Sequence, residues 1–218
     1  MIKYDRYQPE FFEDTKTYIN KRATYSRMLM AKALLIKNQK LFDEVEKKYN
    51  VEKELLLALW GIETNFGKHV GKMDIISSLA TLSFDKRRSE FFSKELIILL
   101  KLIDQKLLDA DTLYGSWAGA FGNFQFMPSS IENYAIDYDK NGKIELKQSL
   151  HDAVASAANY LNKIGWKYQS SCFYKVKLTK PIPKKYINTS AKKIKNYMTI
   201  KSWKENGIVD IDHMSVKN

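Results

Sequence analysis

Apolar residues recur three and four positions apart along most of residues 1–165, and this spacing predicts a mainly helical chain. Asn50 and Asp152 stand where they can cap the helices that follow them, while Gly67 and Gly165 stand where helices end. The expected helices cover residues 11–20, 25–49, 51–66, 75–82, 89–108, 128–135 and 153–164.

The helical period is lost over residues 114–128, YGSWAGAFGNFQFMP, which mix small residues with aromatic ones. This composition predicts a loop whose backbone lies very close to a neighbour, because glycine and alanine leave room for one. Phe121, Phe124 and Phe126 are expected in the core in preference to stacking on a bound ligand.

The pattern changes again after Trp166. Residues 172–185, CFYKVKLTKPIPKK, alternate enough for one short strand, which the two prolines would end. Residues 171–218 hold eleven lysines against three acidic residues, and this favours a solvated face over a polyanion contact. We therefore expect a helical domain over residues 1–166 and a basic extension over residues 167–218.

Composition narrows the class of protein. The 218 residues are 44% hydrophobic and 13% aromatic, as in a globular protein with a real core. The net charge of +11 indicates an anionic partner such as nucleic acid, a membrane surface or an acidic polymer, yet no nucleic-acid recognition motif is present. Cys172 is the only cysteine, so no intrachain disulfide can form, and an inert thiol is expected. Apolar runs such as Leu96 to Leu100 are too short for a bilayer, and MIKYDRYQPEFF lacks a signal-peptide pattern.

One carboxylate interrupts the apolar face of a helix, in WGIETNFG at residues 60–67. Glu63 lies three residues after Trp60 and three before Phe66, so this spacing points it at the core or at the floor of a cleft. Burial and the negative end of the helix both disfavour the charged form, so we expect a raised pKa, as a general acid in glycoside cleavage requires. A structural glutamate bound by a neighbouring hydroxyl, amide or arginine is the alternative, and spacing alone slightly favours it.

Several longer blocks follow DRYQPEF in a fixed order, namely WGIETNFG, ATLSFDKRRSEFF, GSWAGAFGNFQFMPSS and DAVASAANYLNKIGW. The chain resembles the B-type membrane-bound lytic murein transglycosylases of the lysozyme-like superfamily. The resemblance reaches at least Trp166, and the motif blocks follow the order and approximate spacing of that family. The resemblance implies a mainly α, lysozyme-like catalytic domain. An EF-hand-like loop and a small α+β C-terminal extension, part of the family's longer C-terminal segment, would accompany it.

That family cleaves peptidoglycan between N-acetylmuramic acid and N-acetylglucosamine without water, leaving a 1,6-anhydromuramic end. The resemblance places the catalytic acid at Glu63, which would protonate the glycosidic oxygen and then accept the proton of the attacking muramic C6 hydroxyl. A glycoside hydrolase normally needs a second carboxylate, about 5 Å from the first in a retaining enzyme or about 6.5–9.5 Å from it in an inverting one. Asp74 and Asp85 fit better as a helix cap or as an ion-pair partner than as this second carboxylate. An intramolecular hydroxyl nucleophile removes the need for a second carboxylate, because proximity replaces the activation of water. A lysozyme-type hydrolase and a non-catalytic or weakly active peptidoglycan-binding relative are the alternatives.

The resemblance also implies a set of substrate-binding residues. Arg87 and Arg88 match the family's paired arginines, which are expected to bind acidic peptide stems or lactyl carboxylates in bidentate fashion. As isolated surface residues, such arginines would usually carry no function. The expected sugar-binding residues are Ser116, Gln125, Tyr160 and, on thinner local similarity, Tyr18.

Residues 137–148 carry oxygen ligands at positions one, three and five and a glycine at position six, as in an EF-hand loop. Gln148 replaces the usual glutamate at position twelve, and Asp152 can close the family's longer version. An Asn-Gly turn between two short strands is the equally weighted alternative. The expected ligands, of a structural calcium ion, are Asp137, Asp139, Asn141, Lys143 and Asp152. The chemistry itself is expected to need no cofactor.

Family members carry a signal or lipoprotein segment before DRYQPEF and a closing segment beyond the element that Trp203 and Gly207 resemble. The 218 residues include neither segment. Without the closing segment, one wall of the cleft is expected to be missing. The resemblance implies a periplasmic or outer-membrane-associated monomer that acts on peptidoglycan glycan strands and not on nucleic acid. Peripheral membrane attachment would come from the N-terminal segment.

Overall fold

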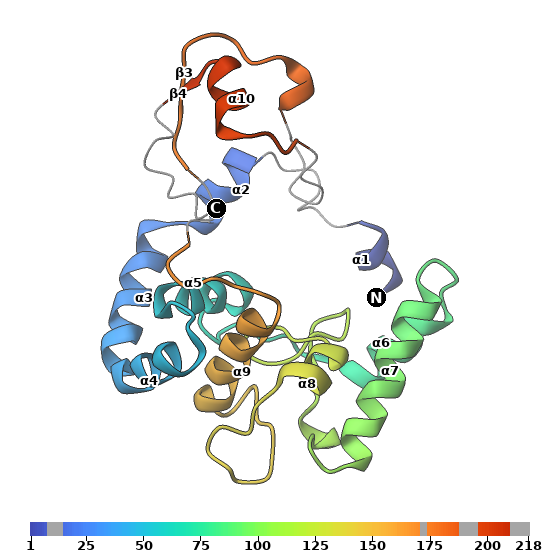
Figure 1. Cartoon of the computed structure of the whole chain (residues 1–218). Coiled ribbons are helices and arrows are strands. Elements are labelled where there is room, and N and C mark those ends of the chain that lie inside the picture. Colours follow the sequence, from blue (N-terminus) through green and yellow to red (C-terminus); the bar gives the residue numbers. More distant parts are fainter. Residues whose placement is uncertain (8–14, 171–173, 188–195, 210–218) are drawn as a thin grey trace. The chain divides into compact units, whose positions relative to one another are not determined.

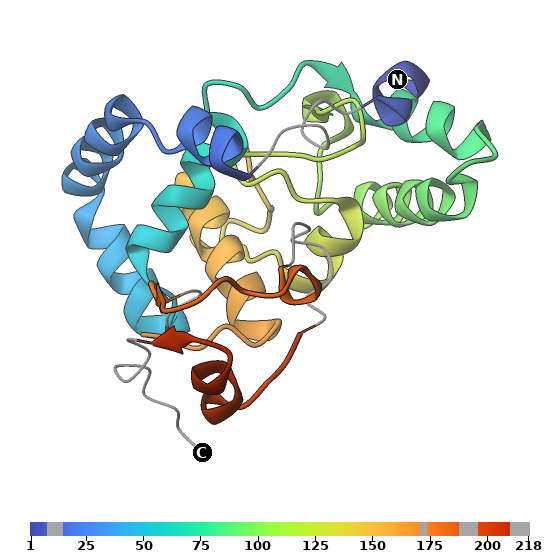
Figure 2. The same ribbon diagram turned by 90° about the horizontal axis from the view of Figure 1, so that it is seen from above.

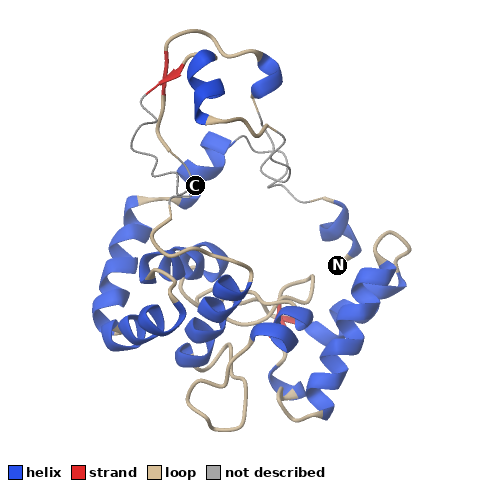
Figure 3. Ribbon diagram, in the orientation of Figure 1, coloured by secondary structure: helices blue, strands red, loops and turns tan. Residues whose placement is uncertain are grey.

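Helices make up most of the computed structural model, as the residue spacing predicted (Figures 1 and 3). The structure describes residues 1–7, 15–170, 174–187 and 196–209. Its helices are α1 (Ile2–Arg6), α2 (Thr15–Arg22), α3 (Tyr25–Lys37), α4 (Gln39–Tyr49), α5 (Lys53–Thr64), α6 (Ile75–Phe84), α7 (Ser89–Asp104), α8 (Pro128–Tyr134), α9 (Leu150–Lys163) and α10 (Ile200–Glu205). The strands are β1 (Met73–Asp74), β2 (Tyr114–Gly115), β3 (Lys177–Leu178) and β4 (Ile208–Val209). The chain divides into two compact units, Met1–Tyr168 and Gln169–Asn218, and each is described by itself.

The first unit is built from two groups of helices joined by α8. Helix α5 contacts α3, α4 and α9, while α6 and α7 form a helical hairpin (Figures 1 and 2). Helix α8 contacts both α7 and α9, so it links the two groups. Phe42, Leu56, Leu79 and Phe92 are fully buried in the core between them. Residues 152–158 of α9 are all buried, because their small side chains allow close packing.

The 114–128 loop does lie very close to a neighbour, and that neighbour is the protein itself. Gly119 and Gly122 have φ angles of +89° and +75°, in the left-handed region that favours glycine. A Cβ atom at Gly119 would lie 2.5 Å from the Leu79 side chain, and one at Gly122 would lie 2.7 Å from the Leu146 backbone oxygen. The core placement of the loop aromatics is confirmed, since Phe121, Phe124 and Phe126 are 2%, 8% and 6% exposed.

Residues 25–49 form two helices where the spacing predicted one. The chain breaks at Asn38, with φ −118° and ψ 25°, and the Asn38 side-chain Nδ2 donates to the Leu34 carbonyl at 2.9 Å. This side-chain bond competes with continued helix, as asparagine commonly does. The hydrophobic period could not reveal the break, because apolar residues continue on both sides of it.

Two predicted helix caps are also wrong. Asn50 ends α4 in the left-handed conformation, with φ 52°, and Glu52 stands at the N-cap of α5. The last helix of the unit begins at Leu150, with the Ser149 hydroxyl accepting from the Asp152 backbone N–H at 3.2 Å. Asp152 therefore lies inside α9, and its carboxylate serves the preceding loop.

Other ends shift by a few residues. The helix expected over residues 89–108 ends as α7 at Asp104, and α5 covers Lys53–Thr64 within the expected 51–66. The expected helix over residues 11–20 falls partly outside the described residues, and α2 occupies Thr15–Arg22. No strand flanks the Asn141-Gly142 turn within the described residues 136–149, so the hairpin alternative for this loop is wrong.

The second unit holds the short strand expected near residues 172–185. Strand β3 pairs antiparallel with β4, with Lys177 opposite Val209. Trp203 of α10 contacts Tyr186 edge to face at 5.9 Å between ring centroids. The expectation for Cys172 lies outside the described residues. Within the described part of the chain, no helix is long and apolar enough to cross a membrane.

Candidate active site

Glu63 lies on the last turn of α5, where the helix ends abruptly. Asn65 and Phe66 both take left-handed backbone angles, with φ 50° and 60°, so the chain turns back at once. The Phe66 ring consequently lies against Gly61 and meets Trp60 edge to face at 5.6 Å between centroids. Because Phe66 folds back in this way, it does not extend the helix face on which Glu63 lies.

The Glu63 side chain is exposed, so of the two expected directions the core is wrong, and the floor of a cleft stays a prediction. Its carboxyl makes no hydrogen bond or ion pair with the described residues. Protein atoms around it still displace much of its water, and this desolvation raises the pKa of Glu63, as expected. The result is an acid that is open to a ligand and disposed to hold its proton.

Asn123 fixes the helix turn that carries Glu63. Its Oδ1 accepts from Trp60 Nε1 at 2.9 Å, and its backbone oxygen accepts from Thr64 Oγ1 at 2.8 Å. Its Nδ2 donates to the carbonyls of Leu146 and Lys147 at 3.0 and 3.1 Å. Sequence reasoning did not single out Asn123, although it lies inside the GNFQFMP block. Its position between a tryptophan and two carbonyls follows from the fold alone.

Ser116 and Gln125 are held by the loops around them. The Ser116 hydroxyl oxygen accepts from the N–H groups of Ala118 and Ala120 at 3.3 and 2.9 Å, so its own O–H remains to donate. Gln125 has a φ of 52°, and its Nε2 donates to the carbonyls of Val70 and Gly122 at 3.3 and 3.0 Å. With both N–H donors engaged, the side-chain oxygen of Gln125 is its remaining polar atom.

Tyr160 and Tyr18 lie on different elements, α9 and α2. The half-buried Tyr160 ring meets Phe126 and Tyr134 edge to face, at 5.9 and 5.1 Å between centroids. Phe126 belongs to the 114–128 loop, so Tyr160 joins α9 to that loop. Tyr18 lies beneath the Arg22 guanidinium at 3.8 Å and lines a cavity that α5 also lines.

Arg87 and Arg88 are bound to a single carboxylate, Asp5 of α1. Asp5 is 4% exposed, and Arg87 donates to it through Nε at 2.9 Å and also through Nη2. Arg87 Nη2 reaches the Asp5 backbone oxygen at 2.6 Å, and Arg88 Nη1 reaches Oδ1 at 3.1 Å. This intramolecular partner was not predicted, and binding of substrate anions by the two arginines stays a prediction.

The two aspartates considered as a second acid are engaged elsewhere. The Asp74 carboxylate accepts from the Ser77 N–H at 2.6 Å and so caps α6, which lowers the pKa of Asp74. Asp85 pairs with Arg6 at 3.4 Å. The expected roles of Asp74 as a helix cap and of Asp85 as an ion-pair partner are both confirmed.

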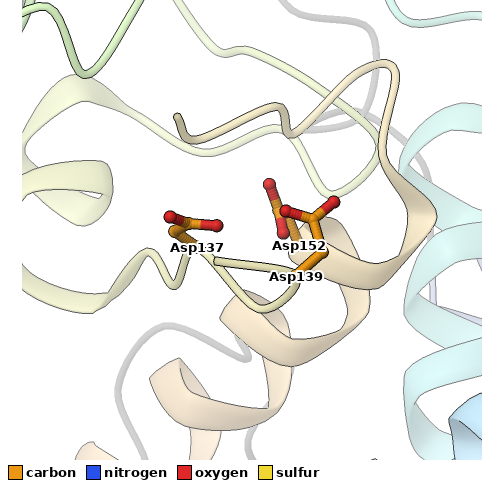
Figure 4. Close-up of side chains that lie close together, drawn as sticks. All are labelled: Asp137, Asp139 and Asp152. Carbon is orange, nitrogen blue, oxygen red and sulfur yellow. The ribbon is translucent and has the colours of Figure 1, made fainter. Parts of the chain in front are cut away.

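The loop after α8 brings three of the expected metal ligands together. Ligand oxygens of Asp137, Asp139 and Asp152 all lie within 4.8 Å of one another (Figure 4). Asp152 is buried, accepts from the N–H groups of Tyr138 and Glu145 at 2.9 and 3.0 Å, and has a pKa raised chiefly by burial. Three hard carboxylates suit Ca²⁺ or Mg²⁺. The Asn141 side-chain oxygen instead accepts from the Lys143 N–H at 2.9 Å, closing the loop from within.

Comparison with known proteins decides the family. Residues 1–218 match the family model described as the transglycosylase SLT domain. The chain belongs to this family. Membership confirms the resemblance carried by the motif blocks, and with it the mainly α, lysozyme-like fold class.

Three relatives of this transglycosylase SLT domain illustrate the match. The membrane-bound lytic murein transglycosylase B of Escherichia coli (strain K12) is 44% identical over 119 residues, which are 54% of this chain and 33% of the relative. The crystal structure of SltB3 from Pseudomonas aeruginosa in complex with NAG-NAM-pentapeptide has a TM-score of 0.73 and 36% identity, covering 76% of this chain and 44% of that one. The structure of Escherichia coli lytic transglycosylase SLT35 in complex with calcium has a TM-score of 0.65 and 36% identity, covering 71% of this chain and 50% of that one. The chain thus spans between a third and a half of the length of these relatives.

Proposed function

We propose that the chain is a peptidoglycan lytic transglycosylase with Glu63 as its acid and base. One observation carries the assignment. An exposed carboxyl without a partner among the described residues has a raised pKa, at the end of a helix that Asn123 fixes in place. A structural glutamate would instead be bound by the neighbours that spacing alone anticipated.

In this mechanism Glu63 first donates its proton to the oxygen between muramic acid and N-acetylglucosamine, and the C1–oxygen bond breaks. The muramic C6 hydroxyl then attacks C1, and the Glu63 carboxylate takes the proton that this hydroxyl loses. The products are a 1,6-anhydromuramic end and a free N-acetylglucosamine end, with no water consumed. Since the nucleophile belongs to the same sugar, proximity replaces activation of water, and no second carboxylate is needed.

The other assignments form part of the same proposal. The Ser116 hydroxyl donates to the sugar, the Gln125 side-chain oxygen accepts from it, and Tyr160 and Tyr18 contact it. Calcium binds Asp137, Asp139 and Asp152 and stabilises the loop, while the chemistry uses no cofactor. The name and complexes of the relatives support a peptidoglycan substrate and a periplasmic, membrane-associated location. A monomer remains part of the proposal.

Product analysis tests the proposal directly. Purified protein is incubated with murein sacculi, and mass spectrometry identifies the released fragments. We expect 1,6-anhydromuropeptides from the wild type and none from Glu63→Gln, with normal product from Glu90→Gln, which changes an exposed glutamate on α7. Reducing-end muropeptides would identify a hydrolase, and binding without products would identify a non-catalytic relative.

A further inference from the structure

Glu95 of α7 is a buried acid that the proposed mechanism does not use. It takes a place in the buried stripe of this helix, whose other members are the apolar residues Phe92, Leu99 and Leu102. Glu95 is 4% exposed, and among the described residues its carboxylate forms no ion pair. A buried charge without an ion pair is costly unless hydrogen bonds compensate for it, so the partners of Glu95 indicate what it does.

The hydrogen bonds of Glu95 go to one residue, Ser129, at the start of α8. The Glu95 carboxylate accepts from the Ser129 backbone N–H at 2.8 Å and from the Ser129 hydroxyl at 2.7 Å. Met127, the N-cap residue of α8, makes no side-chain cap, and Pro128 has no N–H to donate. Ser129 therefore carries the first N–H group of the helix, and Glu95 caps it from another helix.

Helix α8 in turn holds the ring of Tyr160. Phe126 lies two residues before α8 and Tyr134 is the last residue of α8, and both rings meet Tyr160 edge to face. The Tyr134 carbonyl also accepts from Asn159 Nδ2 at 2.8 Å, beside Tyr160 on α9. Gln125 directly precedes Phe126 in the chain. A shift of α8 would therefore displace Tyr160 and Gln125 together.

We propose that Glu95 is a positioning residue of the substrate site and that it acts through α8. The inference rests on the proposed function, in which Tyr160 and Gln125 contact the sugar. By fixing the first turn of α8, Glu95 keeps these two side chains where they can bind it. Loss of the cap should weaken sugar binding without removing any group that touches the substrate.

Three variants and one control test the inference on soluble glycan strands. Glu95→Met keeps the length of the side chain and removes both hydrogen bonds. Glu95→Gln can keep both, since its amide oxygen accepts from the Ser129 N–H and its amide nitrogen donates to the Ser129 hydroxyl. Ser129→Ala removes the hydroxyl bond alone. The control Glu132→Met changes an exposed acid of α8, which pairs with Lys101 of α7 at 3.5 Å.

We expect Glu95→Met to raise KM roughly five- to tenfold, the effect of about one lost hydrogen bond between protein and sugar. Ser129→Ala should raise KM less, and Glu95→Gln and Glu132→Met should leave it unchanged. Partial unfolding lowers kcat, because fewer molecules are active, and leaves KM as it is, so a rise in KM separates positioning from stability. For a wild type that binds the strands without cleaving them, the dissociation constant takes the place of KM.

Hydrogen exchange separates this inference from the proposed function. Exchange of the amides of residues 126–136 should rise in Glu95→Met and stay as in the wild type in Glu95→Gln and Glu132→Met, whatever products the wild type releases. Unchanged exchange in Glu95→Met, or unchanged KM in both Glu95→Met and Ser129→Ala, would overturn the positioning role while leaving the transglycosylase assignment in place. An equal rise of KM in Glu95→Gln would overturn it as well. Ser129→Ala keeps the backbone bond to Glu95, so it serves the test should Glu95→Met fold poorly.

Discussion

At the scale of single residues, the proposed chemistry depends on a carboxyl that keeps its proton. Desolvation raises the pKa of Glu63, and the protonated form is the one that can donate to a leaving oxygen. We therefore expect kcat/KM to fall as pH rises through a pKa above the usual glutamate value. Anhydromuropeptide release measured across pH 4 to 9, at constant ionic strength, reports this limb. A profile that rises over the same range would contradict the role of Glu63 as the initial acid.

Asn123 is the residue on which the position of Glu63 depends. Replacing it with alanine removes the side-chain bonds to Trp60, Leu146 and Lys147, and leaves the Trp60 N–H buried without a partner. We expect Asn123→Ala to lower the free energy of unfolding by about 2–3 kcal/mol, measured by urea denaturation, and to lower kcat as well. Asn123→Asp keeps the acceptor for Trp60 but places a carboxylate oxygen against the Leu146 and Lys147 carbonyls, so it should lose at least as much. A variant of unchanged stability would show that Asn123 does not fix this turn.

The sequence could reveal the role of a residue only where its partner lies close to it along the chain. Asp74 caps a helix that begins one residue later, so its role was predictable, as were the buried phenylalanines of a loop rich in small residues. Asn123 and Trp60 are 63 residues apart, and Asp5 and Arg87 are 82 apart. No periodicity connects such pairs, so their contacts could not be predicted. The family motifs marked the segments without indicating which side chains meet.

At the scale of elements, the helices were predictable and their ends were not. Hydrophobic spacing located α5, α6, α8 and α9 within a few residues. Two of the errors fall on asparagines, because Asn38 and Asn50 each end a helix by side-chain or left-handed geometry that period counting does not register. A third falls on Asp152, which lies inside α9 because Ser149 caps that helix.

Helix α1 is short and depends on an ion pair for its position. Five residues cannot sustain a helix alone, so Asp5 with Arg87 and Arg88 holds it. Breaking a buried pair costs about 3–5 kcal/mol, but both guanidiniums are partly exposed, and about 2 kcal/mol is expected for Asp5→Asn. Hydrogen exchange over residues 2–6 should rise at the same time.

Arg6 supplies the matched control for this ion pair. It is 61% exposed and meets Asp85 at 3.4 Å, so Arg6→Gln should cost less than about 0.5 kcal/mol. Equal losses in Asp5→Asn and Arg6→Gln would mean that the buried carboxylate is no more important than a surface pair.

The loop over residues 137–152 should be stabilised by calcium. Three carboxylates lie within 4.8 Å of one another, so a bound cation would offset their repulsion. Calcium at about 100 times its Kd should raise the free energy of unfolding by about 2.7 kcal/mol, seen as a higher Tm that EGTA reverses. Asp137→Asn should abolish this shift, and Asp111→Asn, at an exposed acid outside the loop, should retain it. Anhydro product should still form with EGTA, since calcium takes no part in the chemistry.

At the scale of the whole molecule, the sequence indicated both the helical first unit and a short strand in the second. Composition alone left nucleic acid, membrane and acidic polymer equally open as partners. The family match and the geometry of Glu63 favour a cell-wall polymer as the partner. For such a partner, the net charge of +11 predicts electrostatic attraction. A cationic protein and a polymer with carboxylate-bearing stems should attract each other over several ångströms.

This attraction should depend on salt. Raising NaCl from 0.1 to 1 M shortens the Debye length from about 10 to about 3 Å, so the long-range part of the attraction is lost. The Glu63→Gln variant, which leaves sacculi intact, should therefore sediment with them less at 1 M than at 0.1 M. Glycan strands stripped of peptide stems carry far less charge, and binding to them should change less with salt. If binding to intact sacculi stayed constant across this range, local contacts at the cleft, and not the net charge, would account for the recognition of peptidoglycan.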